Sequence, residues 1–323
     1  MSFTFEIPKS DEIVHEIVGF IRVYKDGHCE RLVGTNKLPA GIDSSTGVIS
    51  KDVVISPETN LSARIYIPKT VTTDRKLPVL IYIHGGGFIV ESTTSSDYHP
   101  TLNYLTAGSN VITVSVDYRL GPENPVPAGY NDCWEAIHWV ASHCTGGGPD
   151  PWLNNIGDFQ KVFFAGDSAG ANIVHSMGVR FRLDPIAGIN LKGVLLLDPY
   201  FGGVVAIGSE REKGKEMKAF TDQFWNLANP SVTGLDDPLF NPEKDPRMSG
   251  VGCSRILLCV AELDSLRDRG LLYKEMMEKN GWPGKLEMLE SKGEDHVFFL
   301  FDHTSENARI LFDTICTFIN HSC

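Results

Sequence analysis

Six short, continuous apolar runs occur between residues 77 and 289, separated by stretches of helix length. Strands with this pattern are covered on both faces, as in parallel sheets. The series therefore predicts an α/β fold with a doubly wound, mostly parallel central sheet and helices on both faces. The predicted strands are 79–83, 111–116, 162–164, 194–197, 256–260 and 286–289, and the predicted helices are 130–142, 169–180, 267–280 and 305–321.

The segment before residue 77 has shorter runs with turn signals between them. Two β-like runs, 21–24 and 29–33, flank Lys25-Asp26-Gly27, and Asp-Gly between apolar runs is a hairpin signal. Two further strands are expected at 52–55 and 61–67, the second of which alternates apolar and polar residues. These runs predict an antiparallel beginning to the sheet.

No strand-like run occurs between Tyr200 and Asn241, but residues 210–220 have helical spacing. We interpret residues 203–242 as part of a helical cap above the sheet. Residues 1–20 are expected to complete this cap, because Ile13, Val14, Ile17 and Val18 also have helical spacing. A chain of 323 residues can bury one large core, so we expect a single domain over residues 1–323.

Composition excludes several classes of partner. The net charge of -12, without a basic run, disfavours binding to nucleic acid. No stretch approaches the ~18 consecutive apolar residues of a membrane span. The first residues lack the basic start and apolar core of a secretory signal, which predicts a cytoplasmic protein. The seven cysteines are scattered and no ligand cluster has metal spacing, so neither a metal nor a cofactor is expected.

The motif with the clearest chemistry is Gly166-Asp167-Ser168-Ala169-Gly170, which directly follows a predicted strand and directly precedes a predicted helix. In this context G-x-S-x-G is a nucleophile elbow, in which small residues permit the sharp turn that exposes the serine hydroxyl. The bare pattern is weak because glycine and serine are common. The strand before it and the helix after it make the assignment of Ser168 as a nucleophile much stronger.

A second glycine motif, His84-Gly85-Gly86-Gly87-Phe88, ends the predicted strand 79–83. Consecutive glycines allow backbone N–H groups to turn toward a carbonyl, and together with the N–H of Ala169 they could hold an oxyanion. The alternatives are a flexible loop or a phosphate site. The motif lacks the Lys-Ser/Thr ending of a P-loop, which disfavours the phosphate site.

The general base and its acid are expected after the serine, in the order acid and then histidine. Four histidines follow Ser168, and only His296 lies just past a predicted strand. His175 would lie inside the helix after the serine, and His303 and His321 have the pattern of surface residues. Asp264 follows the strand 256–260 and is the preferred acid, with Asp268 as its nearest rival.

Together these motifs resemble the hormone-sensitive-lipase-like branch of the α/β-hydrolases. The chain is most similar to the plant carboxylesterase group that includes 2-hydroxyisoflavanone dehydratases and gibberellin receptors. The likeness covers nearly the whole chain, and its motifs are residues 21–27, 84–88, 117–120, 166–170, 264–270 and His296.

By position, the resemblance implies a set of site residues. The nucleophile, acid and base would be Ser168, Asp264 and His296. The oxyanion donors would be Gly86, Gly87 and Ala169, with support from His84, Gly85 and Asp167. The family motif supports Asp264 over Asp268. The resemblance also implies a capped pocket and an α/β-hydrolase fold.

Differences within the group favour one activity. The hormone receptors have lost the catalytic histidine, whereas His296 is present here; the dehydratases and cyclising enzymes tend to replace the serine or alter the glycine motif, and both are intact here. We therefore expect a carboxylesterase that hydrolyses a small acyl ester, such as a plant specialised metabolite or xenobiotic, through an acyl-enzyme. A dehydratase, lyase or cyclase and a small-molecule receptor are the alternatives. The expected partner is a small-molecule ester, and a homodimer is also considered.

Overall fold

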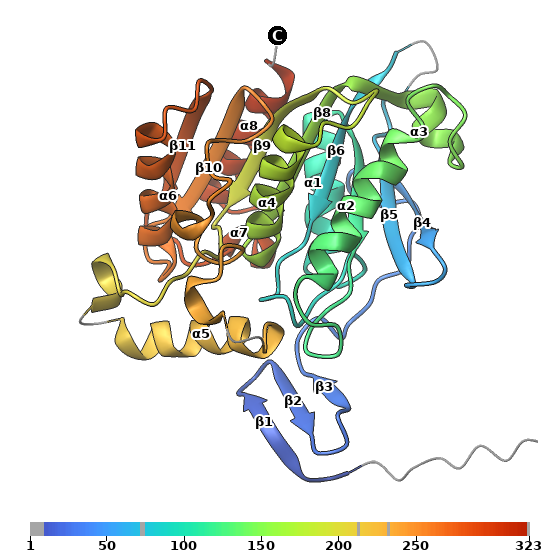
Figure 1. Ribbon diagram of the computed structural model, residues 1–323. Coiled ribbons are helices and arrows are strands. Elements are labelled where there is room, and N and C mark those ends of the chain that lie inside the picture. Colours follow the sequence, from blue (N-terminus) through green and yellow to red (C-terminus); the bar gives the residue numbers. More distant parts are fainter. Residues whose placement is uncertain (1–9, 72–74, 212–213, 231–232, 322–323) are drawn as a thin grey trace, which may run out of the picture.

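An eight-stranded sheet forms the centre of the computed structural model (Figure 1). The structure describes residues 10–71, 75–211, 214–230 and 233–321. Across the sheet the strand order is β11-β10-β9-β8-β6-β7-β5-β4. The strands are β4 (Ile49–Ser56), β5 (Leu61–Ile67), β6 (Leu77–Ile83), β7 (Ile112–Asp117), β8 (Gly157–Asp167), β9 (Leu191–Leu197), β10 (Arg255–Ala261) and β11 (Lys285–Ser291).

The predicted sheet is confirmed. All pairs from β11 to β7 are parallel, and β7 pairs antiparallel with β5, which in turn pairs antiparallel with β4. The six apolar runs form the six parallel strands. Helices bury the five inner ones on both faces, whereas the edge strand β11 is mostly half-buried or exposed. The antiparallel beginning is also confirmed, but only the runs predicted at 52–55 and 61–67 join this sheet, as β4 and β5.

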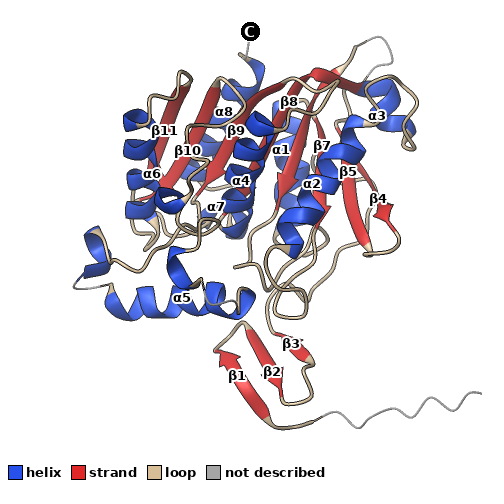
Figure 2. Cartoon of the chain, in the orientation of Figure 1, coloured by secondary structure: helices blue, strands red, loops and turns tan. Residues whose placement is uncertain are grey.

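Helices cover both faces of the sheet (Figure 2). One hydrophobic cluster joins the sheet to α2 (Ala128–Ala141), α4 (Ala169–Leu183) and α6 (Arg267–Lys279). The other joins it to α1 (Tyr98–Ser109), α7 (Phe298–Phe301) and α8 (Glu306–Asn320). A short helix, α3 (Pro151–Ile156), precedes β8. The four predicted helices are confirmed as α2, α4, α6 and α8, whereas α1, α3 and α7 were not predicted.

The order of the strands reverses at β6. The chain goes from β6 to β7 on one side of it, and β8 then lies on its other side. In open α/β sheets, ligands bind outside the carboxyl ends of the strands at such a switch point. The glycine motif follows β6 and Ser168 follows β8, so the topology brings the two motifs to the same crevice.

The N-terminal part of the described chain is a separate three-stranded antiparallel sheet of β1 (Ile13–Ile17), β2 (Ile21–Tyr24) and β3 (Cys29–Arg31). The predicted hairpin is confirmed as β2 and β3. The helix expected around Ile13 to Val18 is wrong: residues 13–17 form β1, which pairs with β2 and has four of its five residues exposed, and Val18 lies in the turn that follows. This part of the expected cap is therefore not helical, and residues 1–9 lie outside the described residues.

The segment after β9 contains α5 (Lys215–Ala228) and three short 3-10 helices, Gly208–Arg211, Gly234–Asp236 and Pro242–Lys244. The helix predicted over 210–220 is present but begins and ends later. In Figure 1, α5 lies between the central sheet and the three-stranded sheet. A buried ion pair of Glu210 with Arg269 of α6, 2.6 Å long, attaches this segment to the main body. No helix in the described ranges is long and apolar enough to cross a membrane.

Candidate active site

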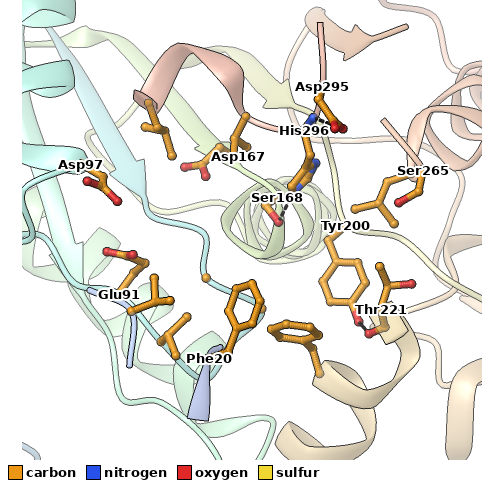
Figure 3. Close-up of a pocket in the computed structure, with 18 of the residues that line it drawn as sticks. Phe20, Glu91, Asp97, Asp167, Ser168, Tyr200, Thr221, Ser265, Asp295 and His296 are labelled. Atoms are coloured by element: carbon orange, nitrogen blue, oxygen red, sulfur yellow. Dashed lines mark hydrogen bonds between the residues drawn. The ribbon is translucent and has the colours of Figure 1, made fainter. Parts of the chain in front are cut away.

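Ser168 occupies a sharp turn between β8 and α4. Its backbone has φ 51° and ψ -120°, a conformation that residues other than glycine rarely adopt. The turn requires Gly170, because a Cβ there would lie 2.0 Å from the carbonyl oxygen of Ile83 at the end of β6. Strain at this turn directs the hydroxyl away from the sheet, and Figure 3 shows it pointing toward His296.

The structure brings Ser168, His296 and Asp264 into one hydrogen-bonded line. Nδ1 of His296 lies 2.8 Å from Oδ2 of Asp264, so this nitrogen carries the ring proton and donates it. Nε2 lies 2.9 Å from Oγ of Ser168, where the neutral ring can accept the hydroxyl proton. Asp264 is buried, and its Oδ1 also accepts the N–H of Leu266. A hydroxyl held against a base that a carboxylate orients is the arrangement that activates a serine.

The rival residues lie elsewhere. Asp268 is at the start of α6, where it accepts the N–H of Ser209 and pairs with Arg267. His175 is buried inside α4, and its Nδ1 lies 3.2 Å from the hydroxyl of Tyr273. Asp295 accepts the backbone N–H of His296, 2.7 Å away, so it contacts the backbone of that residue. Of the two candidate acids, the preferred Asp264 contacts the ring of His296, whereas Asp268 contacts Ser209 and Arg267.

The glycine motif forms a loop beside Ser168. Gly86 has φ +90°, and a Cβ there would lie 2.2 Å from the carbonyl oxygen of Val90. The hydroxyl of Tyr118 donates to the carbonyls of His84 and Gly85, at 2.9 and 3.1 Å. These contacts hold the loop in place, and both Gly86 and Gly87 line the cavity above the serine.

His84 and Asp167 support the loop from beneath. His84 is fully buried and stacks on Tyr118, and burial lowers its pKa to about 4, so the imidazole is neutral. Asp167 accepts hydrogen bonds from the hydroxyls of Tyr82 (2.8 Å) and Tyr98 (2.7 Å). Burial raises the pKa of Asp167 to about 6, against the opposing effect of these two bonds. The hydroxyl of Tyr98 also accepts the N–H of Gly85, which connects this acid to the glycine loop.

Asp198 is a buried carboxylate of the site that the sequence analysis missed. It follows β9, and its Oδ2 accepts the N–H of Val297, next to His296. A carboxylate oxygen of Asp198, a carboxylate oxygen of Asp264 and a ring nitrogen of His296 all lie within 4.8 Å of one another. One signal could have found Asp198: it stands directly after a predicted parallel strand, as Ser168 and the glycine motif do.

Carboxylates determine the charge state of His296. Burial is the largest single effect and would lower its pKa. The charge and hydrogen bond of Asp264, together with the charges of Asp198 and Asp167, outweigh burial and raise the pKa of His296 to about 9. The site therefore stabilises an imidazolium, which is the form that His296 takes after it accepts a proton.

A cavity of about 360 Å³ lies above Ser168. Its apolar wall includes residues from the N-terminal sheet and α5: Phe20, Val33, Met217, Phe220 and Phe224. The ring centroids of Phe20 and Phe224 are 4.9 Å apart, so the two segments meet above the site. Four acidic residues also line the cavity, namely Glu91, Asp97, Asp167 and Asp295, whereas none of the described lining residues is a lysine or arginine.

Comparisons with known proteins agree with this architecture. The model of a family described as alpha/beta hydrolase fold matches residues 80–300. Probable carboxylesterase 7 of Arabidopsis thaliana is 44% identical over 301 residues, which cover 93% of this chain and 96% of that protein. Tuliposide A-converting enzyme 1, chloroplastic, of Tulipa gesneriana is 41% identical over 312 residues, covering 96% of this chain and 78% of that protein.

Solved structures give the same result. A Pyrobaculum calidifontis esterase superposes with a TM-score of 0.70 and 26% identity, over 84% of each chain. The fold, the family match and the extent of identity to the plant proteins agree. The chain belongs to the α/β-hydrolase family, in the hormone-sensitive-lipase-like group that contains these plant carboxylesterases.

Proposed function

We propose that the protein is a carboxylesterase that hydrolyses small, uncharged acyl esters by way of an acyl-enzyme. The observation that carries this proposal is the line of contacts from Ser168 through His296 to the buried Asp264, at the base of a largely apolar cavity. The names of the relatives, which include probable carboxylesterases and esterases, support the same reaction.

In the proposed first step, His296 takes the proton of Ser168 while Oγ attacks the ester carbonyl. The carbonyl oxygen becomes an oxyanion, for which the backbone N–H groups of Gly86, Gly87 and Ala169 would be the donors. The imidazolium then gives its proton to the leaving alcohol as the carbon–oxygen bond breaks. Water attacks the acyl-enzyme with His296 again as base, and the acid leaves as Ser168 regains its proton.

The experiment that tests the proposal is a panel of p-nitrophenyl esters with acyl chains of increasing length, measured with the wild type and Ser168→Ala. Hydrolysis that depends on Ser168 supports the proposal, and no hydrolysis of any ester would refute it. Product analysis on ester-bearing plant metabolites separates hydrolysis from elimination or cyclisation. A receptor would bind without turnover.

The charge of the cavity predicts a selectivity. An acyl group that ends in a carboxylate would be repelled by Glu91, Asp97 and Asp295. Among the described lining residues only His296, beside the reacting carbonyl, can be cationic, and no lysine or arginine offsets the three acids. We expect kcat/KM for mono-p-nitrophenyl succinate to be about ten- to a hundredfold below that for p-nitrophenyl butyrate, given ~2 kcal/mol of repulsion at an effective dielectric constant near 20. Initial rates, corrected for spontaneous hydrolysis, measure the ratio. Equal values would contradict the role of the acidic residues, and Glu91→Gln should narrow the difference.

The raised pKa of His296 predicts an alkaline optimum. Only the neutral imidazole can accept the proton of Ser168, and a pKa of about 9 keeps the ring protonated at lower pH. We therefore expect kcat/KM to fall as the pH decreases below about 9, by a factor approaching ten per unit. Profiles between pH 6 and 10 on an uncharged ester measure it. A profile already level at pH 7 would contradict the predicted stabilisation of the imidazolium.

We further propose that the chain is one domain in which the three-stranded sheet and α5 together form the cap. The ring contacts of Phe20 with Phe220 and Phe224 of α5 support this assignment. The hydrogen bond from the Tyr200 hydroxyl to the carbonyl of Thr221 in α5 also supports it. The proposed cap thus combines strands and a helix within the expected ranges 1–20 and 203–242, and extends beyond the first to residue 31.

Two expectations from the sequence stay predictions. A cytoplasmic location is one of them, because the Tulipa relatives are described as chloroplastic and amyloplastic. Cell fractionation of the tagged protein would decide it. Whether the chain forms a homodimer is the other, and light scattering would measure it.

A further inference from the structure

Two neighbouring strands are each followed by a carboxylate that lies near His296. β9 and β10 are parallel neighbours in which Leu197 is opposite Cys259. Asp198 directly follows the first strand and Asp264 follows the second after a short loop. Asp198 is 3% exposed, its N–H donates to the carbonyl of Cys259, and its φ of 43° is in the left-handed region.

Two residues of this contact, Asp198 and Val297, have a backbone conformation that costs free energy. Val297, whose N–H donates to Oδ2 of Asp198 over 2.9 Å, has φ 48°, a rare value for a β-branched residue. Backbone strain of this kind persists only where the surroundings impose it. The bond from Val297 to Asp198 ties the loop that carries His296 to the end of β9, beside the turn of Ser168, whose N–H donates to the carbonyl of Leu197.

We propose that Asp198 is a positioning residue for the reaction proposed above, a second carboxylate that holds the His296 loop and shares the stabilisation of its imidazolium with Asp264. This inference rests on the proposed function. The distances support it. One polar atom from each of the three side chains, a carboxylate oxygen or a ring nitrogen, lies within 4.8 Å of the other two, while the ring itself is hydrogen-bonded to Asp264. Asp198 acts on the ring by charge and on the backbone by its hydrogen bond.

Of the titratable groups that face Asp198, His296 is half-buried and the others are buried. Besides His296 and Asp264, the charge of Asp167 from β8 acts on Asp198, and the pKa values of Tyr82 and Cys259 rise through burial and, in part, through the charge of Asp198. Burial raises the pKa of Asp198 to about 7, with the charge of His296 opposing it. Asp198 is therefore ionised over the alkaline range in which the enzyme is expected to work.

The decisive variant is Asp198→Asn, which removes the charge but keeps an oxygen that can accept the N–H of Val297. We expect the acid limb of its kcat/KM profile to move down by about one pH unit, because a nearby negative charge raises the pKa of a histidine. At pH 9 to 10 its kcat should fall by about tenfold, since the imidazolium formed during the reaction loses one partner. A purely structural defect would lower activity without moving the profile.

Sharing between the two acids is tested by removing both. Asp264→Asn alone should retain more kcat than the double variant Asp198→Asn/Asp264→Asn. The factor by which the double variant lowers kcat should be at least about ten times the product of the factors for the two single variants. Asp198→Ala removes the acceptor as well, so it should be less active than Asp198→Asn at every pH. Thermal melts and circular dichroism check that each variant folds.

Asp158→Asn is the matched control. It removes the same charge from β8 at the end opposite Ser168, where the side chain accepts only the N–H of Gln160 among the described residues. The pH profile of kcat/KM for this control should equal that of the wild type.

NMR titration of the His296 ring gives a readout that does not need activity: the pKa of His296 should fall in Asp198→Asn. An unchanged pKa with independent losses for the two acids would overturn the role of Asp198, whereas an inactive wild type with a shifted pKa would refute the proposed esterase and leave this role standing.

Discussion

Replacing Ser168 with alanine is expected to lower kcat on p-nitrophenyl esters by at least about 10⁴-fold, because the variant loses the only atom that forms the acyl-enzyme in the proposed mechanism. Rate in excess of the uncatalysed reaction would then come from binding and from the glycine loop alone. The measurement is kcat with purified protein, accompanied by labelling with a fluorophosphonate, which should modify the wild type and spare the variant.

Ser176→Ala is a suitable control for that experiment. Ser176 lies in α4, two turns beyond Ser168, and both residues are 7% exposed, so each variant removes one buried hydroxyl from the same part of the fold. The control should keep wild-type kcat and label normally. If Ser168→Ala kept full activity while folded, the acyl-enzyme mechanism would be excluded.

Replacing His296 with alanine is expected to reduce kcat to a similar extent, since Ser168 loses the base that contacts its hydroxyl at 2.9 Å. Groups that act as one unit are not additive. The variant Ser168→Ala/His296→Ala should therefore be no less active than the worse of the two single variants. The rates of all three variants on one ester, measured at pH 9, provide the comparison.

His138→Ala serves as the control for the second experiment, because His138 is an exposed residue in the last turn of α2, outside the cavity. Its kcat should be unchanged. Losses that multiply in the double variant would mean that Ser168 and His296 act in separate steps, contrary to the proposed mechanism.

Local pattern was sufficient where burial is continuous or where a motif has strong steric requirements. The apolar runs predicted the parallel strands, and the glycines of residues 166–170 predicted a turn that only small residues permit. The sequence also predicted that Ser168, Asp264 and His296 act together. The structure brings these side chains within hydrogen-bond distance, and their catalytic roles stay predictions until the variants are measured.

Local pattern failed where tertiary contacts override it. Helix α1 was not predicted, because its buried face contains Thr101, Asn103, Thr106 and Ser109 as well as leucines, so no apolar stripe appears in the sequence. Ile13, Val14, Ile17 and Val18 suit a helix by spacing, but residues 13–17 form a strand that pairs with β2, and Val18 lies in the turn after it. Spacing alone is a weak guide for short β-branched segments.

The sequence by itself determined the parallel core, the nucleophile turn and the order of the three proposed catalytic residues, because these follow from periodicity and from steric limits between near neighbours. Only the tertiary structure showed that the predicted acid Asp264 contacts His296, that Asp198 lies beside them, and that Glu91, Asp97 and Asp295 line one cavity. These residues are far apart in the chain, and the order of the strands brings them together. Hydrogen bonds and electrostatic effects depend on distance in space, which spacing along the sequence does not specify.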